Sequence, residues 1–123
     1  MIIETMREPD FAADAVCEDD ALEASISGNA DLSLGVALDR FLKSVHDQAC
    51  RQRVRRVTLD LRALTFMNSS GLSSLAGWVA QIQDLPTPAQ YQVKLLASPD
   101  SFWQRRSLYA ISRLADDIVS VEA

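Results

Sequence analysis

The sequence predicts an α/β domain with one sheet of four or five mostly parallel strands and about three helices packed mainly on one face. Three observations support this prediction. The chain has 123 residues, the size of a single domain. From residue 25 onward, strand-like and helix-like patterns alternate, which is typical of parallel strands joined by crossover helices. Across residues 68–71 the spacing of apolar residues changes from about 2 to about 3.6, which indicates a strand, a polar corner and then a helix.

The first 30 residues should contribute the antiparallel part of the sheet. Residues 2–6 offer a short edge strand that Pro9 would end, so residues 1–12 are an extra strand or an arm of the single domain 1–123. Residues 12–17 and 21–27 are predicted strands joined by a hairpin turn at residues 18–20. In the second of these strands, apolar and polar residues alternate, so one face is apolar.

Three amphipathic helices are predicted, alternating with strands at residues 57–61, 91–97 and 118–121. The first helix can be capped by Asp31 or Ser33, the second begins at Asn68 or Ser69, and the third begins at Ser98. Apolar residues at spacings of three and four should bury one face of each helix. They are Leu34, Leu38, Phe41, Leu42 and Val45; Leu72, Leu75, Ala76, Val79 and Ile82; and Phe102, Leu108, Ile111, Leu114 and Ala115.

Composition excludes several classes of protein. With 48% hydrophobic and 24% charged residues, the chain should be globular. No apolar run approaches the ~20 residues of a membrane span. The first residues lack the basic region and apolar core of a signal peptide, so we expect a cytoplasmic protein. A formal net charge of −5 argues against a dedicated nucleic-acid binder.

The sequence offers little for metal or cofactor chemistry. A structural zinc site needs about four Cys or His ligands. The chain has only Cys17, Cys50 and His46, at long or unsuitable spacings. We expect both cysteines to be small buried residues, His46 to lie on the surface, and Trp78 to be a half-exposed packing residue. We therefore predict no metal and no cofactor. An arginine cluster before the central strand is either a solvated turn or a basic patch for an acidic partner or anion, and comprises Arg51, Arg53, Arg55 and Arg56.

The polar corner is the candidate functional site. Asn68, Ser69 and Ser70 stand where a helix begins, and backbone N–H groups there have no partner within the helix. These residues either cap the helix and do nothing more, or form a polar docking site. A serine nucleophile would need a base, and the single histidine belongs to another predicted helix. Gly71 stands alone without a phosphate-binding Gly-rich pattern. We expect no enzyme, and anion binding at the helix start is the weakest alternative.

A longer stretch around this corner resembles a known family. Asp60-Leu61 followed by residues 65–72, Thr-Phe-Met-Asn-Ser-Ser-Gly-Leu, is similar to the signature of STAS domains. The resemblance is specifically to bacterial anti-sigma factor antagonists, also called anti-anti-sigma factors. In that signature a strand ends in Asp-Leu, and Asp-Ser-Ser-Gly-Leu opens a helix after a short apolar step. The resemblance covers residues 21–119. This chain has Asn68 where the family usually has Asp, and Asn also caps helices well.

The resemblance implies a non-enzymatic regulator of transcription. In the family, a serine-kinase anti-sigma factor phosphorylates the serine before the glycine and thereby breaks its complex with the antagonist. That serine is Ser70 here, with Ser69 as the alternative. The implied partner-binding residues are Asn68, Ser69, Ser70, Gly71, Leu72, Ser73 and Ser74. Because Asn68 replaces the usual Asp, a second function is possible: an unphosphorylated STAS scaffold subunit of a signalling or ABC-transporter complex. The sequence also leaves a homodimer open.

Overall fold

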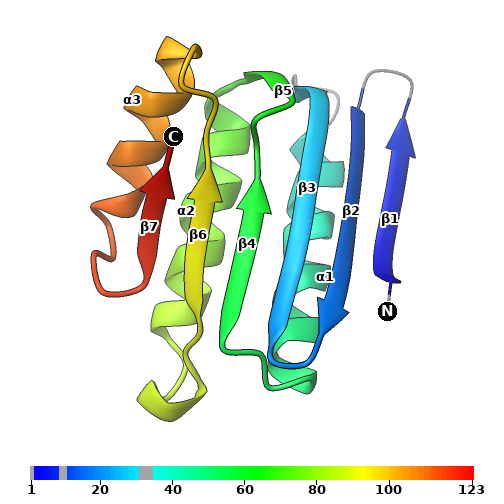
Figure 1. Cartoon of the computed structure of the whole chain (residues 1–123), viewed down its shortest axis with the longest axis vertical. Helices are drawn as coiled ribbons and strands as arrows, with labels where there is room; N and C mark the ends of the chain where they lie inside the picture. Colours follow the sequence, from blue (N-terminus) through cyan, green and yellow to red (C-terminus); the bar gives the residue numbers. More distant parts are fainter. Residues whose placement is uncertain (1, 9–10, 31–34) are drawn as a thin grey trace.

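One sheet and the helices behind it build the fold (Figure 1). The structure is a computed structural model that describes residues 2–8, 11–30 and 35–123. Within these residues the sheet has seven strands in the order β1-β2-β3-β4-β6-β7, with β5 paired to β3. The strands are β1 Ile2–Glu8, β2 Phe11–Glu18, β3 Ala21–Ala30, β4 Arg56–Asp60, β5 Leu64–Met67, β6 Gln92–Leu96 and β7 Val119–Glu122. The helices are α1 Gly35–Arg51, α2 Ser69–Gln83 and α3 Phe102–Ser112, with a 3₁₀ turn, η2, at Thr87–Ala89.

The predicted fold class is confirmed. The pairs β3–β4, β3–β5, β4–β6 and β6–β7 are parallel, whereas β1–β2 and β2–β3 are antiparallel. All three helices lie on the same face of the sheet in Figure 1. The sheet is larger than predicted because β1 extends its edge and because residues 64–67 form a strand of their own. The hairpin between β2 and β3 turns at Asp19, whose φ of 54° lies in the left-handed region that Asp tolerates.

Strand β3 is long enough to pair with two strands in succession. Residues 21–25 pair with β4, and residues 28–30 pair with β5. Between these two pairings the chain makes a turn at residues 61–63. Gly28 has a φ of 99°, a conformation that favours glycine, and its N–H donates to the carbonyl of Ala63 at 3.1 Å. This arrangement carries the chain from the central strand to the start of α2.

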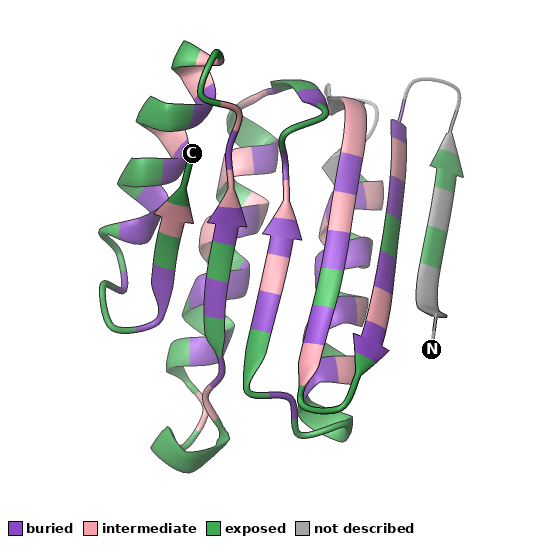
Figure 2. Ribbon diagram, viewed as in Figure 1, coloured by how far each residue is buried: buried purple, intermediate pink, exposed green. Residues whose placement is uncertain are grey.

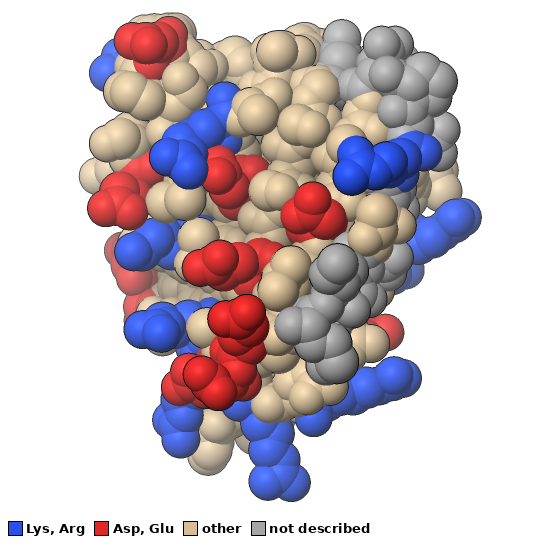
Figure 3. All heavy atoms as spheres, turned by 45° about the vertical axis from the view of Figure 1, so that its right-hand side comes forward, with Lys and Arg blue, Asp and Glu red and all other residues tan. Residues whose placement is uncertain are grey.

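Buried residues alternate with intermediate or exposed residues along β2, β3, β4 and β6, so the two faces of the sheet differ in burial (Figure 2). On the helix side, alternate residues of β2, β3, β4 and β6 are buried, as Leu22, Ala24 and Ile26 show for β3. The other face is open to solvent. A hollow of about 660 Å³ lies there over β2, β3 and β4, and Asp14, Glu18 and Glu23 are among its lining residues. Figure 3 shows acidic side chains on this side of the molecule.

The helices depart from prediction at several positions. The predicted caps of α1, Asp31 and Ser33, lie outside the described residues. The predicted start of α3 at Ser98 is wrong, because Ser98 and Ser101 form a separate turn and the helix begins only at Phe102. Phe102 and Leu114, both predicted to be buried, are instead exposed.

A hydrogen-bonded cluster beneath the sheet corrects three further expectations. Trp78 is buried rather than half-exposed, and its Nε1 donates to the Tyr91 hydroxyl at 2.8 Å. His46 is half-buried rather than on the surface, with Nδ1 2.7 Å from the same hydroxyl. Cys17 is buried as predicted, whereas Cys50 is exposed and lies with Sγ 3.9 Å from His46 Nε2.

Candidate functional site

The polar corner is the start of α2, as the sequence predicts. Asn68 is the N-cap residue, with φ −83° and ψ −178°, and its Oδ1 accepts a hydrogen bond from the N–H of Gly71 at 3.0 Å. The Asn68 carbonyl accepts the first helical bond from Leu72 at 3.1 Å. Helix geometry leaves the N–H groups of Ser69 and Ser70 without a partner inside the helix. The corner therefore presents two hydroxyls beside a weakly positive helix end.

The seven predicted partner-binding residues divide into an exposed group and a supporting group. Ser69, Ser70 and Ser73 are exposed, and Ser73 lies one turn further along the same helix face. The other residues are half-buried or buried and hold the helix start in place: Asn68, Gly71, Leu72 and Ser74. The structure thus brings the three exposed hydroxyls together on one surface.

Gly71 is fixed by packing. A Cβ added at this position would lie 2.5 Å from Met67 Cγ and 3.3 Å from Leu38 Cδ2. Any larger residue would push the first turn of α2 away from β5 and α1. The atoms that such a Cβ would meet belong to the side chains of Met67 and Leu38. The glycine therefore lets the turn that carries Ser69 and Ser70 sit directly on the core.

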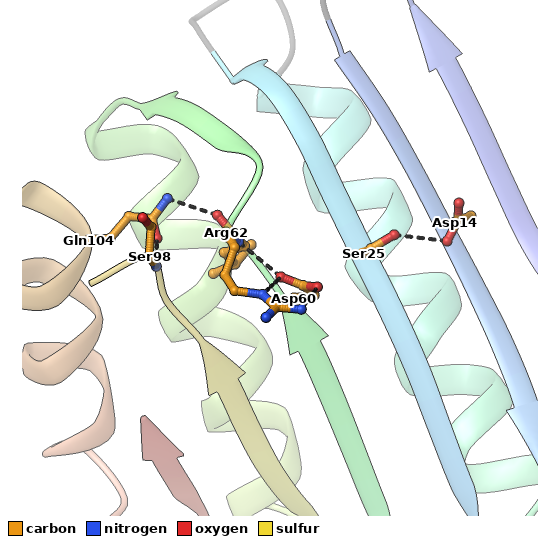
Figure 4. Close-up of polar contacts among 7 residues, drawn as sticks. Asp14, Ser25, Asp60, Arg62, Ser98 and Gln104 are labelled. Atoms are coloured by element: carbon orange, nitrogen blue, oxygen red, sulfur yellow. Dashed lines mark hydrogen bonds and ion pairs between the residues drawn. The ribbon is translucent and has the colours of Figure 1, made fainter. Parts of the chain in front are cut away.

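Gln104 of α3 is a supporting residue that the sequence analysis missed (Figure 4). It is buried, and its Nε2 donates to the carbonyls of Leu61 and Leu64 at 2.8 and 2.7 Å. Its Oε1 accepts from the N–H of Ser98 at 2.7 Å. One side chain thus joins the turn before β5 to the loop before α3. A polar residue within an otherwise amphipathic helix is the signal that could have suggested this role.

Two further bonds attach β5 to its neighbours. The Thr65 hydroxyl donates to the carbonyl of Gly28 at 2.9 Å. Trp103 Nε1 donates to the carbonyl of Thr65 at 3.2 Å. Strand β5 is therefore held by β3 on one side and by the first turn of α3 on the other. This leaves Phe66 46% exposed beside the corner.

Asp60, which ends β4 and belongs to the Asp60-Leu61 motif, has a structural role. Its carboxylate accepts from the backbone N–H of Arg62 at 3.0 Å and from the guanidinium at 3.0 and 2.8 Å (Figure 4). These hydrogen bonds from Arg62 lower the pKa of Asp60 despite a smaller opposing effect of burial. The carboxylate is therefore ionised at neutral pH and shapes the turn at residues 61–63.

Two further groups with shifted pKa values, His46 and Cys50, belong to α1 and not to the corner. His46, the single histidine, bonds to Tyr91, and burial lowers its pKa against a smaller opposing effect of Asp47. Burial, with a smaller contribution from Asp47, raises the pKa of the Cys50 thiol. In the part of the chain that the structure describes, no group of three His, Cys, Asp or Glu residues could hold a metal ion.

The arginine cluster is exposed at the opposite end of β4 from the corner. Arg56 begins that strand, whereas the corner follows β5 after the strand has ended. The cluster and the corner are therefore separate surfaces. None of the described helices is long and apolar enough to cross a membrane.

The solved structures with the same fold include anti-sigma factor antagonists. One from Mycobacterium paratuberculosis matches with a TM-score of 0.65 and 20% identity, over 89% of this chain and 86% of that one. SpoIIAA in its unphosphorylated form matches with a TM-score of 0.57 and 14% identity, over 88% and 84% of the two chains. The phosphorylated Bacillus cell fate determinant SpoIIAA matches with a TM-score of 0.57 and 16% identity, over 88% and 87%. No protein-family model and no curated protein sequence matches this chain. The chain has the fold of anti-sigma factor antagonists.

Proposed function

We propose that this chain is a non-enzymatic regulatory protein that binds a serine-kinase anti-sigma factor through residues 68–74 and is switched by phosphorylation of Ser70. The observation that carries the proposal is the exposed Ser70 hydroxyl in the first turn of α2, on a base fixed by Asn68 and Gly71. The likeness of the fold to SpoIIAA, solved in both unphosphorylated and phosphorylated forms, supports it. In this proposal the protein acts in the cytoplasm and regulates transcription.

The position of Ser70 suits a switch that acts on a complex and leaves the fold intact. A phosphoryl group adds about −1.5 to −2 charge at neutral pH. In the free protein this charge sits at a helix N-terminus, which favours anions. In a complex, the same charge would lie between two packed surfaces, and residues 68–74 contain no Lys or Arg to pair with it, so burying it is costly. Phosphorylation therefore weakens binding while leaving α2 folded.

A second candidate function follows from Asn68. An amide caps α2 through the same bond that an aspartate would make, but it supplies no fixed charge beside the serines. In this alternative the protein is an unphosphorylated scaffold subunit of a signalling or ABC-transporter complex. The exposed serines would then contribute hydrogen bonds at a permanent interface.

A kinase assay separates the two candidates. The wild-type protein is incubated with ATP and a serine-kinase anti-sigma factor from the same organism, beside Ser70→Ala and the matched variants Ser69→Ala and Ser73→Ala. We expect phosphate incorporation that is lost only in Ser70→Ala, and a complex that dissociates on phosphorylation. Equal incorporation in Ser70→Ala would refute the assignment to Ser70. A stable complex without any phosphorylation would favour the scaffold.

A further inference from the structure

Helix α3 has two faces of opposite character. Its buried face carries Gln104, Leu108, Ile111 and Ser112. The opposite face carries Phe102, Arg105, Arg106 and Tyr109, at spacings of three, four and seven residues that place them on one side of a helix. We call these four residues the α3 outer face. Gln104 explains why Phe102 is not in the core: its hydrogen bonds to Leu61, Leu64 and Ser98 turn the helix so that the aromatic ring points outward.

The aromatic side chains of this face are strongly exposed. Phe102 is 68% exposed and Tyr109 is 59% exposed. Together with Arg105 and Arg106 they line one shallow, open hollow. Single exposed apolar residues are ordinary, but two large aromatics on the same helix face form a patch. Aromatic residues and arginine are also the residue types that most often carry binding energy at protein interfaces.

The charge of the α3 outer face contrasts with that of the whole chain. The formal net charge of the protein is −5, whereas α3 contains two arginines and no acidic residue. Within the described residues, the ion pairs join Lys43 to Asp39, Arg62 to Asp60 and Lys94 to Glu122. Arg105 and Arg106 take part in none of them. Both guanidinium groups are therefore available to carboxylates of another molecule.

We propose that the α3 outer face binds an acidic, amphipathic helix of a partner protein. In this complex, apolar side chains of the partner pack on Phe102 and Tyr109, and its carboxylates pair with Arg105 and Arg106 between them. Charge complementarity selects the partner and the two rings provide the apolar area.

Two other occupants fit the surface less well. In a symmetric dimer of this chain, Arg105 and Arg106 at the centre of the face would meet the same arginines of the second copy, and like charges disfavour that packing. A nucleic acid would meet two arginines on a protein with a net charge of −5, too little positive charge for a backbone-binding surface.

This surface is distinct from the corner at Ser70 and does not depend on phosphorylation. Trp103 Nε1 donates to the carbonyl of Thr65, so the first turn of α3 lies next to β5, which leads to the corner. The two surfaces are therefore neighbours.

Fluorescence anisotropy tests the proposal with a defined probe. The probe is a labelled helix-forming peptide of Glu, Leu and Ala, and the reference peptide has Gln in place of every Glu. We expect the wild-type protein to prefer the acidic peptide and to bind it more weakly as salt is raised. The double substitutions Arg105→Glu with Arg106→Glu, and Phe102→Ala with Tyr109→Ala, should each reduce affinity by about tenfold or more.

A matched control separates the α3 outer face from general electrostatics. Arg40→Glu with Lys43→Glu reverses two exposed charges on α1 and should leave affinity for the acidic peptide unchanged within about twofold. All variants should keep a melting temperature close to that of the wild type, because the substituted residues are exposed. The Lys43–Asp39 ion pair that the control loses is an exposed pair and contributes little to stability. Any of four results would overturn the proposal. In the binding assay these are no preference for the acidic peptide, unchanged binding by Arg105→Glu with Arg106→Glu, and tighter binding of a labelled single-stranded DNA. In sedimentation it is a dimer that Phe102→Ala with Tyr109→Ala dissociates.

Discussion

Helices α2 and α3 both begin at the end of the sheet where β4 and β6 finish, but their first turns are held in place in different ways (Figure 1). The start of α2 is closed locally, because Asn68 accepts a hydrogen bond from Gly71 three residues later. The N-cap residue of α3, Ser101, makes no such side-chain bond. The loop before α3 is held instead by Gln104, which also bonds to carbonyls about 40 residues away in the chain.

This difference determines what each helix start presents to solvent. At α2, the cap and the buried Gly71 fix the turn, so Ser69 and Ser70 are free to be exposed hydroxyls. At α3, the buried Gln104 fixes the rotation of the helix and exposes Phe102. A local cap thus yields a small polar surface, and a long-range bond yields an aromatic one.

The largest expected effect comes from removing the long-range bond. Gln104→Leu replaces the amide by an apolar side chain of similar size. It leaves the Ser98 N–H and the Leu64 carbonyl without their partner, while the Leu61 carbonyl keeps its bond from the N–H of Leu64. We expect a loss of about 2–4 kcal/mol in the free energy of unfolding, measured by chemical denaturation.

Gln90→Leu is the matched control for this substitution. Gln90 also donates to two carbonyls, those of Gln83 and Leu85, but it is only partly buried. Water can replace its bonds, so the loss should stay below about 1 kcal/mol. Equal losses in the two variants would mean that burial of Gln104 is not what makes its bonds important.

The next effect concerns the packing beneath the α2 start. Gly71→Ala places a Cβ against Met67 and should cost about 1–3 kcal/mol. Gly77→Ala, in the same helix, meets nothing within 4 Å and should stabilise by up to about 1 kcal/mol. Thermal unfolding of both variants should show a lower melting temperature for Gly71→Ala and an unchanged or higher one for Gly77→Ala. A stabilised Gly71→Ala would show that the first turn of α2 is free to shift.

A smaller effect distinguishes the caps themselves. Asn68→Ala should cost about 1 kcal/mol, because the N–H of Gly71 loses its acceptor. Asn68→Asp should retain the stability of the wild type. Ser101→Ala removes no cap bond and should change stability by less than about 0.5 kcal/mol. The denaturation midpoints of the three variants measure these effects. Equal midpoints for Asn68→Ala and Ser101→Ala would contradict the claim that the Asn68 side chain stabilises the start of α2.

The smallest expected effect is a dependence of stability on pH. It should come from His46 in α1 and not from the starts of α2 and α3. Burial lowers the pKa of His46 in the folded protein below the unfolded value of 6.5. As pH falls below 6.5, the unfolded chain takes up a proton before the folded one does, so stability decreases. His46→Gln should remove part of this decrease between about pH 7 and pH 5. A variant with the same slope as the wild type would show that the decrease in stability comes from groups other than His46.

Much of the fold could be predicted because it depends on local patterns. Alternation in β3 and the spacing of apolar residues in α1 and α2 placed these elements, since burial of one face imposes a period on the sequence. Strand β5 was not separated from its surroundings, because four residues carry too little periodicity. Phe102 and Leu114 were placed in the core because their spacing alone does not show which way α3 is rotated.

The sequence by itself determined the helix start at Asn68 and the serines that follow it, because capping acts within four residues of chain. Only the tertiary structure decided which of those residues are exposed, that Met67 and Leu38 require a glycine at position 71, and that Gln104 supports the corner. The physical reason is that hydrogen bonds and contacts between distant segments leave no period in the sequence. The α3 outer face was likewise decided by the tertiary structure, because it results from the helix rotation that the long-range bonds of Gln104 impose.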